Sequence, residues 1–235
     1  MRLRLRPLDI TGDSVAVHGS PQSLSLWHHR LSWTCRQTPL DLRILGVEPV
    51  SLPSAEPSEP VPSAIARVMQ TIAGQGALLL LANPTQALGT THMAFAEGVR
   101  LIGITNDDDV ACWDALLALG QPCYGVRGDL VVEVSSPRAS SVISALAYGL
   151  FTCHDGVELT TFAESQLGVQ WQTSESIDAS VIGRGGFEIA TSHGTTGSHT
   201  DTGREGTVRV VLRSGPRSCW TQPRFVAPRK GTCAE

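Results

Sequence analysis

The segment Thr191–Asp201, which reads TSHGTTGSHTD, gathers side chains that could bind a metal ion. His193 and His199 lie within it, and Asp201 ends it. Imidazole nitrogens and carboxylate oxygens are common ligands of divalent metals. Glycine, serine and threonine make up most of the remaining positions and are typical of turns. A flexible hairpin loop therefore explains the segment equally well, and we favour that interpretation.

A second candidate is an anion site at Arg184-Gly185-Gly186, where a guanidinium and flexible backbone amides could meet a phosphate. A two-glycine turn is common, however, and also explains these residues. The acidic run at residues 107–109 precedes an expected helix, and helix capping is a sufficient explanation for it. The motifs G-x-x-x-x-G-K-[ST], G-x-G-x-x-G and G-x-S-x-G are absent, so nucleotide-binding and serine-hydrolase functions gain no support.

Strands and helices are expected to alternate between about residues 41 and 150. Ser63 can cap a helix in which Ile65, Val68 and Ile72 recur at helical spacing, and the all-apolar run Ala77–Ala82 follows as a strand. Further strands are expected at Ser14–His18, Asp41–Val47, Val99–Thr105, Tyr124–Val126 and Leu130–Val134, and helices at His92–Glu97, Asp108–Leu119 and Ser140–Gly149. Such alternation is the pattern of a parallel α/β sheet or barrel.

The pattern changes after residue 157, where short alternating segments are separated by glycine, serine and threonine. The expected strands are Val169–Thr173, Ala179–Ile182, Phe187–Ala190 and Thr207–Leu212. We therefore expect an α/β domain at residues 1–155 and a small all-β domain at residues 156–235. The Pro- and Ser-rich stretch between Pro49 and Pro62 predicts a surface loop within the first domain.

Several segments occur in an order and spacing that can be compared with known families. They are Gly46-Val47-Glu48, GQGALLLLANP at residues 74–84, residues 98–106 ending in Asn106, Trp113-Asp114 with Tyr124-Gly125-Val126, and Cys219-Trp220 before Pro223. Together they resemble the PHP (polymerase and histidinol phosphatase) phosphoesterases that carry a C-terminal β extension. The resemblance covers about residues 44 to 226, and the tryptophan-aspartate helix with the strand after it is its most specific part.

The resemblance implies a reduced, distorted PHP-type (TIM-like) β/α barrel followed by a small all-β domain. It also implies a site in which histidines and carboxylates hold metal ions that activate water. The ligands that it identifies here are His18, Glu48 and Asp129. Other family positions carry substitutions, with Asn83, Gly103 and Val131 standing for a histidine, a glutamate and a histidine. The remaining set could hold one divalent metal, Zn, Mn or Fe.

The leading functional interpretation is a relative of metal-dependent phosphoesterases with weak or no hydrolysis of phosphate esters. Whether the chain is an enzyme stays open; an active form would be a hydrolase. Asn83, Asn106 and Arg184 are the candidate substrate-binding residues. The alternative is a non-catalytic binding or scaffold protein that takes a partner or a small phosphorylated or anionic ligand. A third interpretation is an active phosphoesterase with a rearranged site, which would use His28, His29, His92 or His154.

Composition limits the classes of partner. The net charge is −4 and the basic residues are scattered, which argues against nucleic acid. No apolar run is long enough for a membrane helix, and residues 1–13 lack the apolar stretch of a secretory signal, so we expect a cytoplasmic protein. The six cysteines, at positions 35, 112, 123, 153, 219 and 233, contain no C-x-x-C pair and are expected to be free structural thiols.

Overall fold

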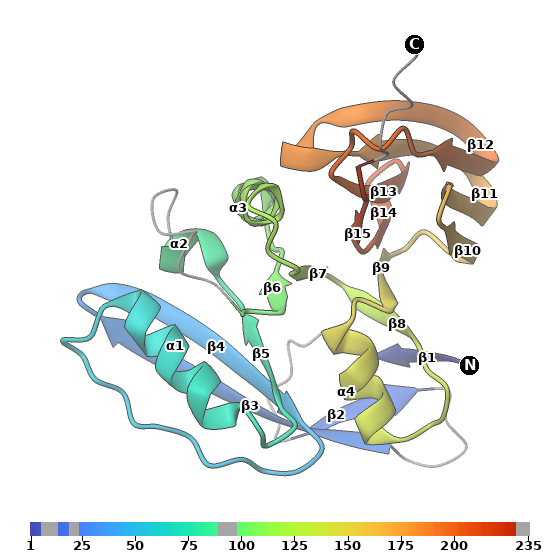
Figure 1. Ribbon diagram of the computed structural model, residues 1–235. Coiled ribbons are helices and arrows are strands. Elements are labelled where there is room, and N and C mark those ends of the chain that lie inside the picture. The colour runs from blue at the N-terminus through green and yellow to red at the C-terminus, as the bar shows by residue number, and fades with distance from the viewer. Residues whose placement is uncertain (6–13, 19–23, 89–97, 229–235) are drawn as a thin grey trace. The chain divides into compact units, whose positions relative to one another are not determined.

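The computed structural model describes residues 1–5, 14–18, 24–88 and 98–228 (Figure 1). The chain divides into two compact units, Met1–Cys153 and His154–Glu235. Within the described ranges, no helix has both the length and the apolar character needed to cross a membrane. The helix expected at residues 92–97 lies outside the described residues.

The first unit is built on one sheet with the strand order β9-β8-β1-β2-β3-β4-β5-β6-β7. Its strands are β1 (Arg2–Leu5), β2 (Ser14–His18), β3 (Leu24–Cys35), β4 (Thr38–Gly46), β5 (Leu78–Leu81), β6 (Leu101–Gly103), β7 (Tyr124–Val126), β8 (Asp129–Glu133) and β9 (Phe151–Asp155). Its helices are α1 (Val61–Ile72), α2 (Pro84–Leu88), α3 (Asp107–Ala118) and α4 (Ala139–Ala147). Pairing is antiparallel from β8 through β5 and parallel from β5 to β7.

The expectation of a reduced, TIM-like β/α barrel is wrong. Such a barrel needs parallel strands that are each followed by a helix. Here β3 and β4 are joined by a turn of two residues and pair antiparallel. The described part of the chain contains fifteen strands and only four α-helices, so the fold is mostly β. Strands and helices do alternate along the chain from β4 to β9, as expected, but β4 pairs antiparallel with both β3 and β5.

The β3–β4 hairpin is the longest regular pairing in the first unit. Its register runs without a bulge from Trp27 opposite Gly46 to Cys35 opposite Thr38. The turn residues Arg36 and Gln37 have φ of 46° and 71°. Two consecutive positive φ values define a turn whose twist matches that of antiparallel strands, so the turn and the long pairing support one another.

Helices cover both faces of this hairpin. Side chains on alternate positions of a strand point to opposite faces, so Leu31 and Trp33 face one way and Leu26 and His28 the other. Arg67 of α1 lies over the Trp33 ring, with its Cζ 5.4 Å from the ring centroid, which places α1 on the first face. Helix α4 contacts β3 and β4 as well as β8 at the other end of the antiparallel run. The sheet therefore curls around α4.

Helix α1 begins at Val61, and the sequence-based cap at Ser63 is wrong because Pro60 occupies the N-cap position. Its buried side chains follow helical spacing: Val61, Ala64, Ile65, Val68 and Ile72. The preceding residues 47–60 form neither helix nor strand, which confirms the surface loop predicted there. Arg67 stabilises the end of this loop, since its guanidinium donates to Glu59 at 2.6 Å and to the Ser54 carbonyl at 2.7 Å.

The buried carboxylate of Asp109 joins α2 to α3. Asp109 is 2% exposed. Its Oδ1 accepts from the Thr85 hydroxyl at 2.9 Å, and its Oδ2 accepts from the Thr105 amide at 3.0 Å and hydroxyl at 2.5 Å. Thr85 lies in α2 after β5 and Thr105 lies after β6. One carboxylate therefore holds together the segments that follow two parallel strands.

Replacing this carboxylate by an amide should destabilise the first unit. In Asp109→Asn, an NH₂ group replaces one acceptor oxygen and must face donors, which costs about 2–4 kcal/mol in the free energy of unfolding. Asp108→Asn is the matched control, because Asp108 is exposed in the same helical turn and should cost less than about 1 kcal/mol. Urea unfolding measures both, and equal losses in the two variants would contradict this role of Asp109.

The second unit consists of strands and one 3₁₀ turn in its described residues. Its elements are β10 (Leu159–Ser165), β11 (Gly168–Ile182), the turn Arg184–Gly186, β12 (Glu188–Thr200), β13 (Thr207–Ser214), β14 (Arg217–Thr221) and β15 (Arg224–Phe225). The order β10-β11-β13-β14 forms the main sheet, β12 pairs with β11, and β15 pairs with β13.

Strand β11 carries the core of this unit. Val169, Trp171, Ile177, Ala179 and Val181 are all buried and lie on one face of the strand. They pack with buried side chains of β13 and with Cys219 of β14. The two strands predicted at residues 169–173 and 179–182 are thus parts of one strand that also includes the polar residues between them.

Candidate functional site

The three candidate metal ligands lie on separate elements of the first unit: His18 on β2, Asp129 on β8 and Glu48 after β4. Glu48 is exposed and follows the end of β4. Asp129 begins β8 and lies 3.8 Å from Arg4 Nε, measured to its Oδ2. His18 ends β2, where its backbone position is the register partner of the same Arg4. A guanidinium beside both positions disfavours a second cation there.

No three histidine, cysteine, aspartate and glutamate side chains within residues 1–5, 26–88 and 98–228 are grouped so that they could hold a metal ion. Position 103, where the PHP resemblance expects a glutamate, leaves no room for a side chain. A Cβ on Gly103 would lie 2.7 Å from the Ala82 carbonyl oxygen of the neighbouring strand.

The candidate substrate-binding asparagines have structural partners. Asn83 follows β5; its Oδ1 accepts from the Asp41 amide at 3.0 Å and its Nδ2 donates to Gln86 Oε1 at 3.0 Å. Asn106 caps α3, since its Oδ1 accepts from the Asp109 amide at 2.9 Å. Both residues lie near the carboxyl ends of adjacent parallel strands. Asn83 connects its segment to β4, and Asn106 bonds within its own segment.

Arg184 belongs to the second unit and its backbone is also engaged. Its amide donates to the Glu205 carbonyl at 2.9 Å, and Gly185 adopts a positive φ of 73°. The glycines here therefore form a turn, and the Arg184 amide is not available to an anion.

The histidines of the rearranged-site interpretation have different environments. His28 is buried, whereas the adjacent His29 is exposed on the other face of β3 and stacks on Trp27 with ring centroids 5.8 Å apart. His154, in the second unit, is buried; its Nδ1 lies 3.1 Å from the Val157 carbonyl oxygen. His92 lies outside the described residues.

The interpretation of Thr191–Asp201 as a flexible hairpin loop is wrong. Residues 191–200 belong to β12, which pairs with β11. The glycine at 197 lies against Trp171, whose ring would be 2.3 Å from an added Cβ, so a small residue is required there for packing. His193 is exposed, and its Nδ1 lies 2.9 Å from Asp178 Oδ1. It does not meet His199 in a common site.

His199 instead joins a buried polar group with Asp201, Glu205 and Arg224, called here the His199 cluster. Its Nε2 lies 3.7 Å from Glu205 Oε1 and 4.0 Å from Asp201 Oδ1. Arg224 forms an ion pair with Asp201 Oδ2 and donates to the Ser165 carbonyl at 3.1 Å. The cluster thus ties β15 to the β10–β11 turn. Sequence reasoning identified His199 and Asp201 but missed Glu205 and Arg224.

Backbone amides hold the Glu205 carboxylate. Burial by itself would raise its pKa, but hydrogen bonds from the Thr202 amide at 2.6 Å and the Gly203 and Arg204 amides at 2.9 Å outweigh burial. They lower the pKa of Glu205 to about 2 from its model-peptide value of 4.5. The ionised carboxylate therefore stabilises the turn between β12 and β13.

The lowered pKa of Glu205 determines whether its contribution to the free energy of unfolding rises or falls with pH. Because the folded-state pKa lies below the unfolded one, the contribution of Glu205 is complete above about pH 5 and is lost as the pH falls toward 2. Its full size is about 3 kcal/mol. Glu205→Gln should lower the free energy of unfolding by roughly that amount at pH 7 and by much less at pH 3.

Urea unfolding at the two pH values measures the effect. Glu158→Gln is the control, since Glu158 is exposed in the same unit and should change stability by less than about 0.5 kcal/mol. A loss in Glu205→Gln that is the same at both pH values would show that the ionised carboxylate is not the cause.

The cysteines at 35, 112, 123, 153 and 219 are free and buried, which confirms the prediction of structural thiols for these five. Burial raises the pKa of Cys112 to about 11 and that of Cys123 to about 12, so both thiols are protonated near neutral pH. Cys233 lies outside the described residues.

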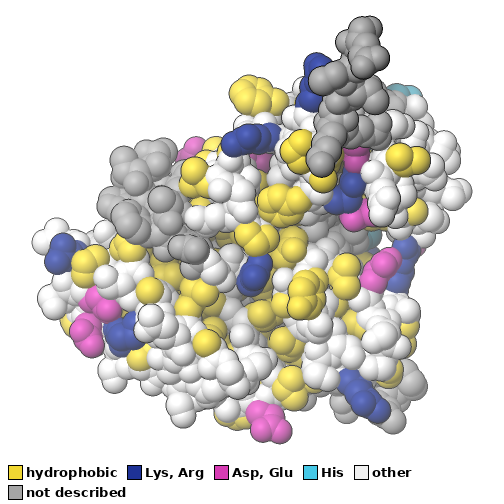
Figure 2. Space-filling model, in the orientation of Figure 1, with side chains coloured by type: hydrophobic (Ala, Val, Ile, Leu, Met, Phe, Trp, Pro, Cys, Tyr) yellow, Lys and Arg dark blue, Asp and Glu magenta, His cyan; other side chains and the backbone are white. Residues whose placement is uncertain are grey.

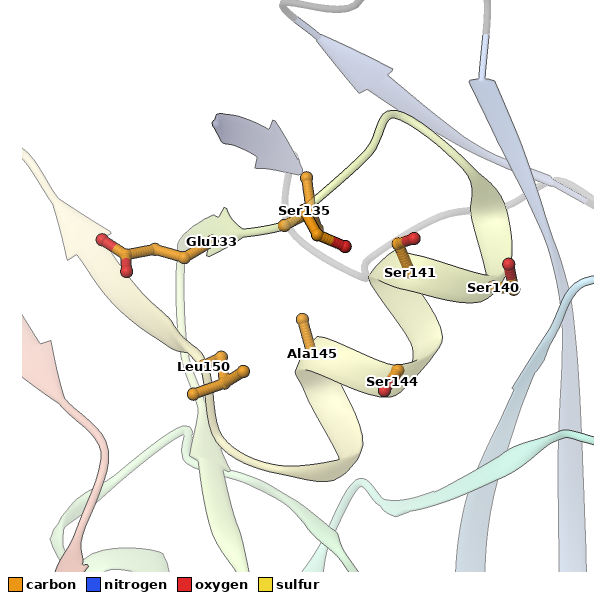
Figure 3. Close-up of a pocket in the computed structure, with 8 residues that line it drawn as sticks. Glu133, Ser135, Ser140, Ser141, Ser144, Ala145 and Leu150 are labelled. Carbon is orange, nitrogen blue, oxygen red and sulfur yellow. The ribbon is translucent and has the colours of Figure 1, made fainter.

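A pocket of about 300 Å³ opens between α4 and the segment that follows β8, and it is called here the serine pocket. Six of the residues that line it are Glu133, Ser135, Ser140, Ser141, Ser144 and Leu150. Figure 3 shows the Ser135 side chain pointing toward Ser141 above Ala145. The volume lies at the lower end of the range for small-molecule sites.

The amino-terminal end of α4 lies beside this pocket. The first amides of an α-helix have no acceptor within the helix, and the side chain of Arg138 at the N-cap makes no capping hydrogen bond. Ser136 and Ser141 hydroxyl oxygens are 2.8 Å apart. Glu133 accepts from Arg2 Nε at 3.2 Å, so its charge is partly compensated. Hydroxyls and a positive helix end together suit an anionic group.

Sequence reasoning identified α4 but not the pocket. A signal was present, because residues 135–144 contain five serines, at 135, 136, 140, 141 and 144.

Lys and Arg side chains on the face drawn in Figure 2 are distributed singly among other side chains, without a continuous basic patch.

Comparisons with protein-family models, curated proteins and solved structures find no match to this chain. The PHP resemblance therefore stays a prediction that depends on the quoted segments.

Proposed function

We propose that this chain is a non-catalytic binding protein, and that the serine pocket takes a small ligand through a phosphate group. The observation that carries the proposal is the grouping of four serines in the pocket lining: Ser135 before α4, and Ser140, Ser141 and Ser144 within it. Phosphate oxygens accept hydrogen bonds from hydroxyls and from helix amides, and the helix dipole favours their charge. The apolar side of the pocket, at Leu150, leaves room for the rest of the ligand.

The candidate ligands from the PHP resemblance support a binding function over a hydrolytic one. Glu48 is exposed, and Asp129 faces Arg4. Asn83 and Asn106 make hydrogen bonds that connect strands and cap a helix. Metal-dependent hydrolysis needs several ligands around one position. Asp129, Asn83 and Asn106 have other partners, and Glu48 is exposed beyond the end of β4.

Binding of inorganic phosphate tests the pocket. We expect saturable chemical-shift changes at the amides of residues 139–144 in NMR titrations at constant ionic strength. The variant Ser135→Ala/Ser140→Ala should weaken binding about tenfold, since two hydrogen bonds to a charged group are lost. Ser63→Ala is the control, because Ser63 is an exposed helical serine of α1 outside the pocket.

The direction in which one further variant changes the affinity distinguishes an anionic ligand from a neutral one. Glu133→Gln removes a negative charge from the lining of the pocket, so phosphate should bind about two- to threefold more tightly. Glycerol, a neutral polyol, should gain nothing from that change. Phosphate binding that is insensitive to the serine pair, or weakened by Glu133→Gln, would contradict the proposal.

Hydrolysis is tested separately with p-nitrophenyl phosphate in the presence of Mn²⁺ or Zn²⁺. We expect no turnover above the metal-only background, because the candidate ligands lie on separate elements, with His18 on β2, Asp129 on β8 and Glu48 after β4. Glu48→Gln and Asp129→Asn should leave that background unchanged. Turnover that EDTA abolishes, added metal restores and both variants lose would establish the chain as a phosphoesterase.

A further inference from the structure

Strand β12 is a long sheet edge. It contains 13 residues and pairs with β11 alone among the strands of the described chain. None of its residues is buried, and those of intermediate exposure lie on the side of the β11 core. An unpaired edge carries a row of backbone donors and acceptors that can extend the sheet with another strand.

Two usual protections of an exposed edge, charged side chains and proline, are absent from β12 after its first residue, Glu188. Residues 189–200 contain no lysine, arginine, aspartate, glutamate or proline. The register shift near the middle of the pairing places four residues of β11, 173–176, opposite the single Thr195. The extra residues at this shift belong to β11. A second shift, between Val181 and Ile182, leaves Ile189 of β12 without a partner residue opposite it, so β12 has a bulge near its start.

The sequence of this edge is partly palindromic: six of its ten residues are the same in both directions, and serine and histidine exchange at the other four. Residues 191–200 read TSHGTTGSHT, with a centre between Thr195 and Thr196. An antiparallel copy about that centre would pair Thr195 with Thr196, Gly194 with Gly197, His193 with Ser198, Ser192 with His199 and Thr191 with Thr200. Threonine pairs are favourable across strands. A twofold interface requires this kind of self-complementary surface.

The residues at the ends of β12 also fit a second copy. The same symmetry brings the exposed Glu188 of one chain toward the exposed Arg204 of the other, which is a complementary charge pair at both ends. Phe187 and Ile189 are 73% and 42% exposed at the start of the strand, and Leu167 is 66% exposed beside its end. The Asp201 amide donates to the Leu167 carbonyl at 2.9 Å. Pairing would bring these apolar side chains from the two copies near one another.

We infer that β12 pairs with β12 of a second copy, and that the chain forms a twofold homodimer with a sheet continuous across the interface. This inference is independent of the serine pocket, which lies in the first unit. Both chains use the same edge, so the pairing closes at two copies.

Sedimentation equilibrium over a range of protein concentrations tests the dimer. The wild-type chain should reach twice the 25.0 kDa mass of one chain. Thr195→Lys/Thr196→Lys places like charges opposite one another across the twofold axis, and should raise the dissociation constant at least about tenfold. Both threonines are exposed, and near-UV circular dichroism checks that the variant keeps its fold.

A charge-swapped partner keeps the test independent of folding. Mixing the lysine variant with Thr195→Glu/Thr196→Glu should restore dimers that contain one chain of each kind. Thr161→Lys/Ala163→Lys adds the same charge to exposed positions of β10 and should leave the dimer unchanged. A wild-type monomer at all concentrations, or a dimer that the threonine variants do not affect, would overturn the inference.

Discussion

The two-residue turn between β3 and β4 determines how the first unit is assembled. Arg36 and Gln37 both adopt positive φ, which costs about 1–2 kcal/mol for each residue that is not glycine. The unbroken pairing from Trp27 to Cys35 offsets that cost. The resulting register assigns Leu31 to the α1 face and Leu26 to the α4 face, and a slip of one residue would exchange them. The neighbouring strands and helices all depend on that assignment.

Local periodicity was enough to predict several elements of the first unit. The expected ranges for β5, α3, β7 and β8 agree with the structure to within two residues. Strands β1 and β3 were not predicted. For β3, the turn that follows it has no glycine or asparagine to signal a hairpin. Without β3, the alternation after residue 41 predicted a parallel sheet. Pairing direction depends on contacts between distant segments, which no local pattern contains.

Packing explains why family-like segments can occur without the family's site. Trp113 lies against Gly125, where an added Cβ would come within 2.8 Å of the indole ring. The indole nitrogen donates to the Cys123 carbonyl at 3.1 Å. This arrangement requires a tryptophan and a glycine at that spacing whatever the chemistry of the protein. The prediction that His18, Glu48 and Asp129 are ligands of one metal depended instead on a TIM-like barrel. The largely antiparallel sheet does not form that barrel, so it gives no reason for the three residues to lie together.

The second unit shows why composition misled at Thr191–Asp201. Small polar residues are typical of loops, yet on an edge strand they allow close packing on one face and exposure on the other. Gly197 admits the Trp171 ring, while β11 supplies the register that composition does not contain. Glu205 presents the same difficulty, because its carboxylate is stabilised by backbone amides rather than by residues that a motif could identify. Such a site exists only after the turn has formed, so the fold and the electrostatics of this unit stabilise one another.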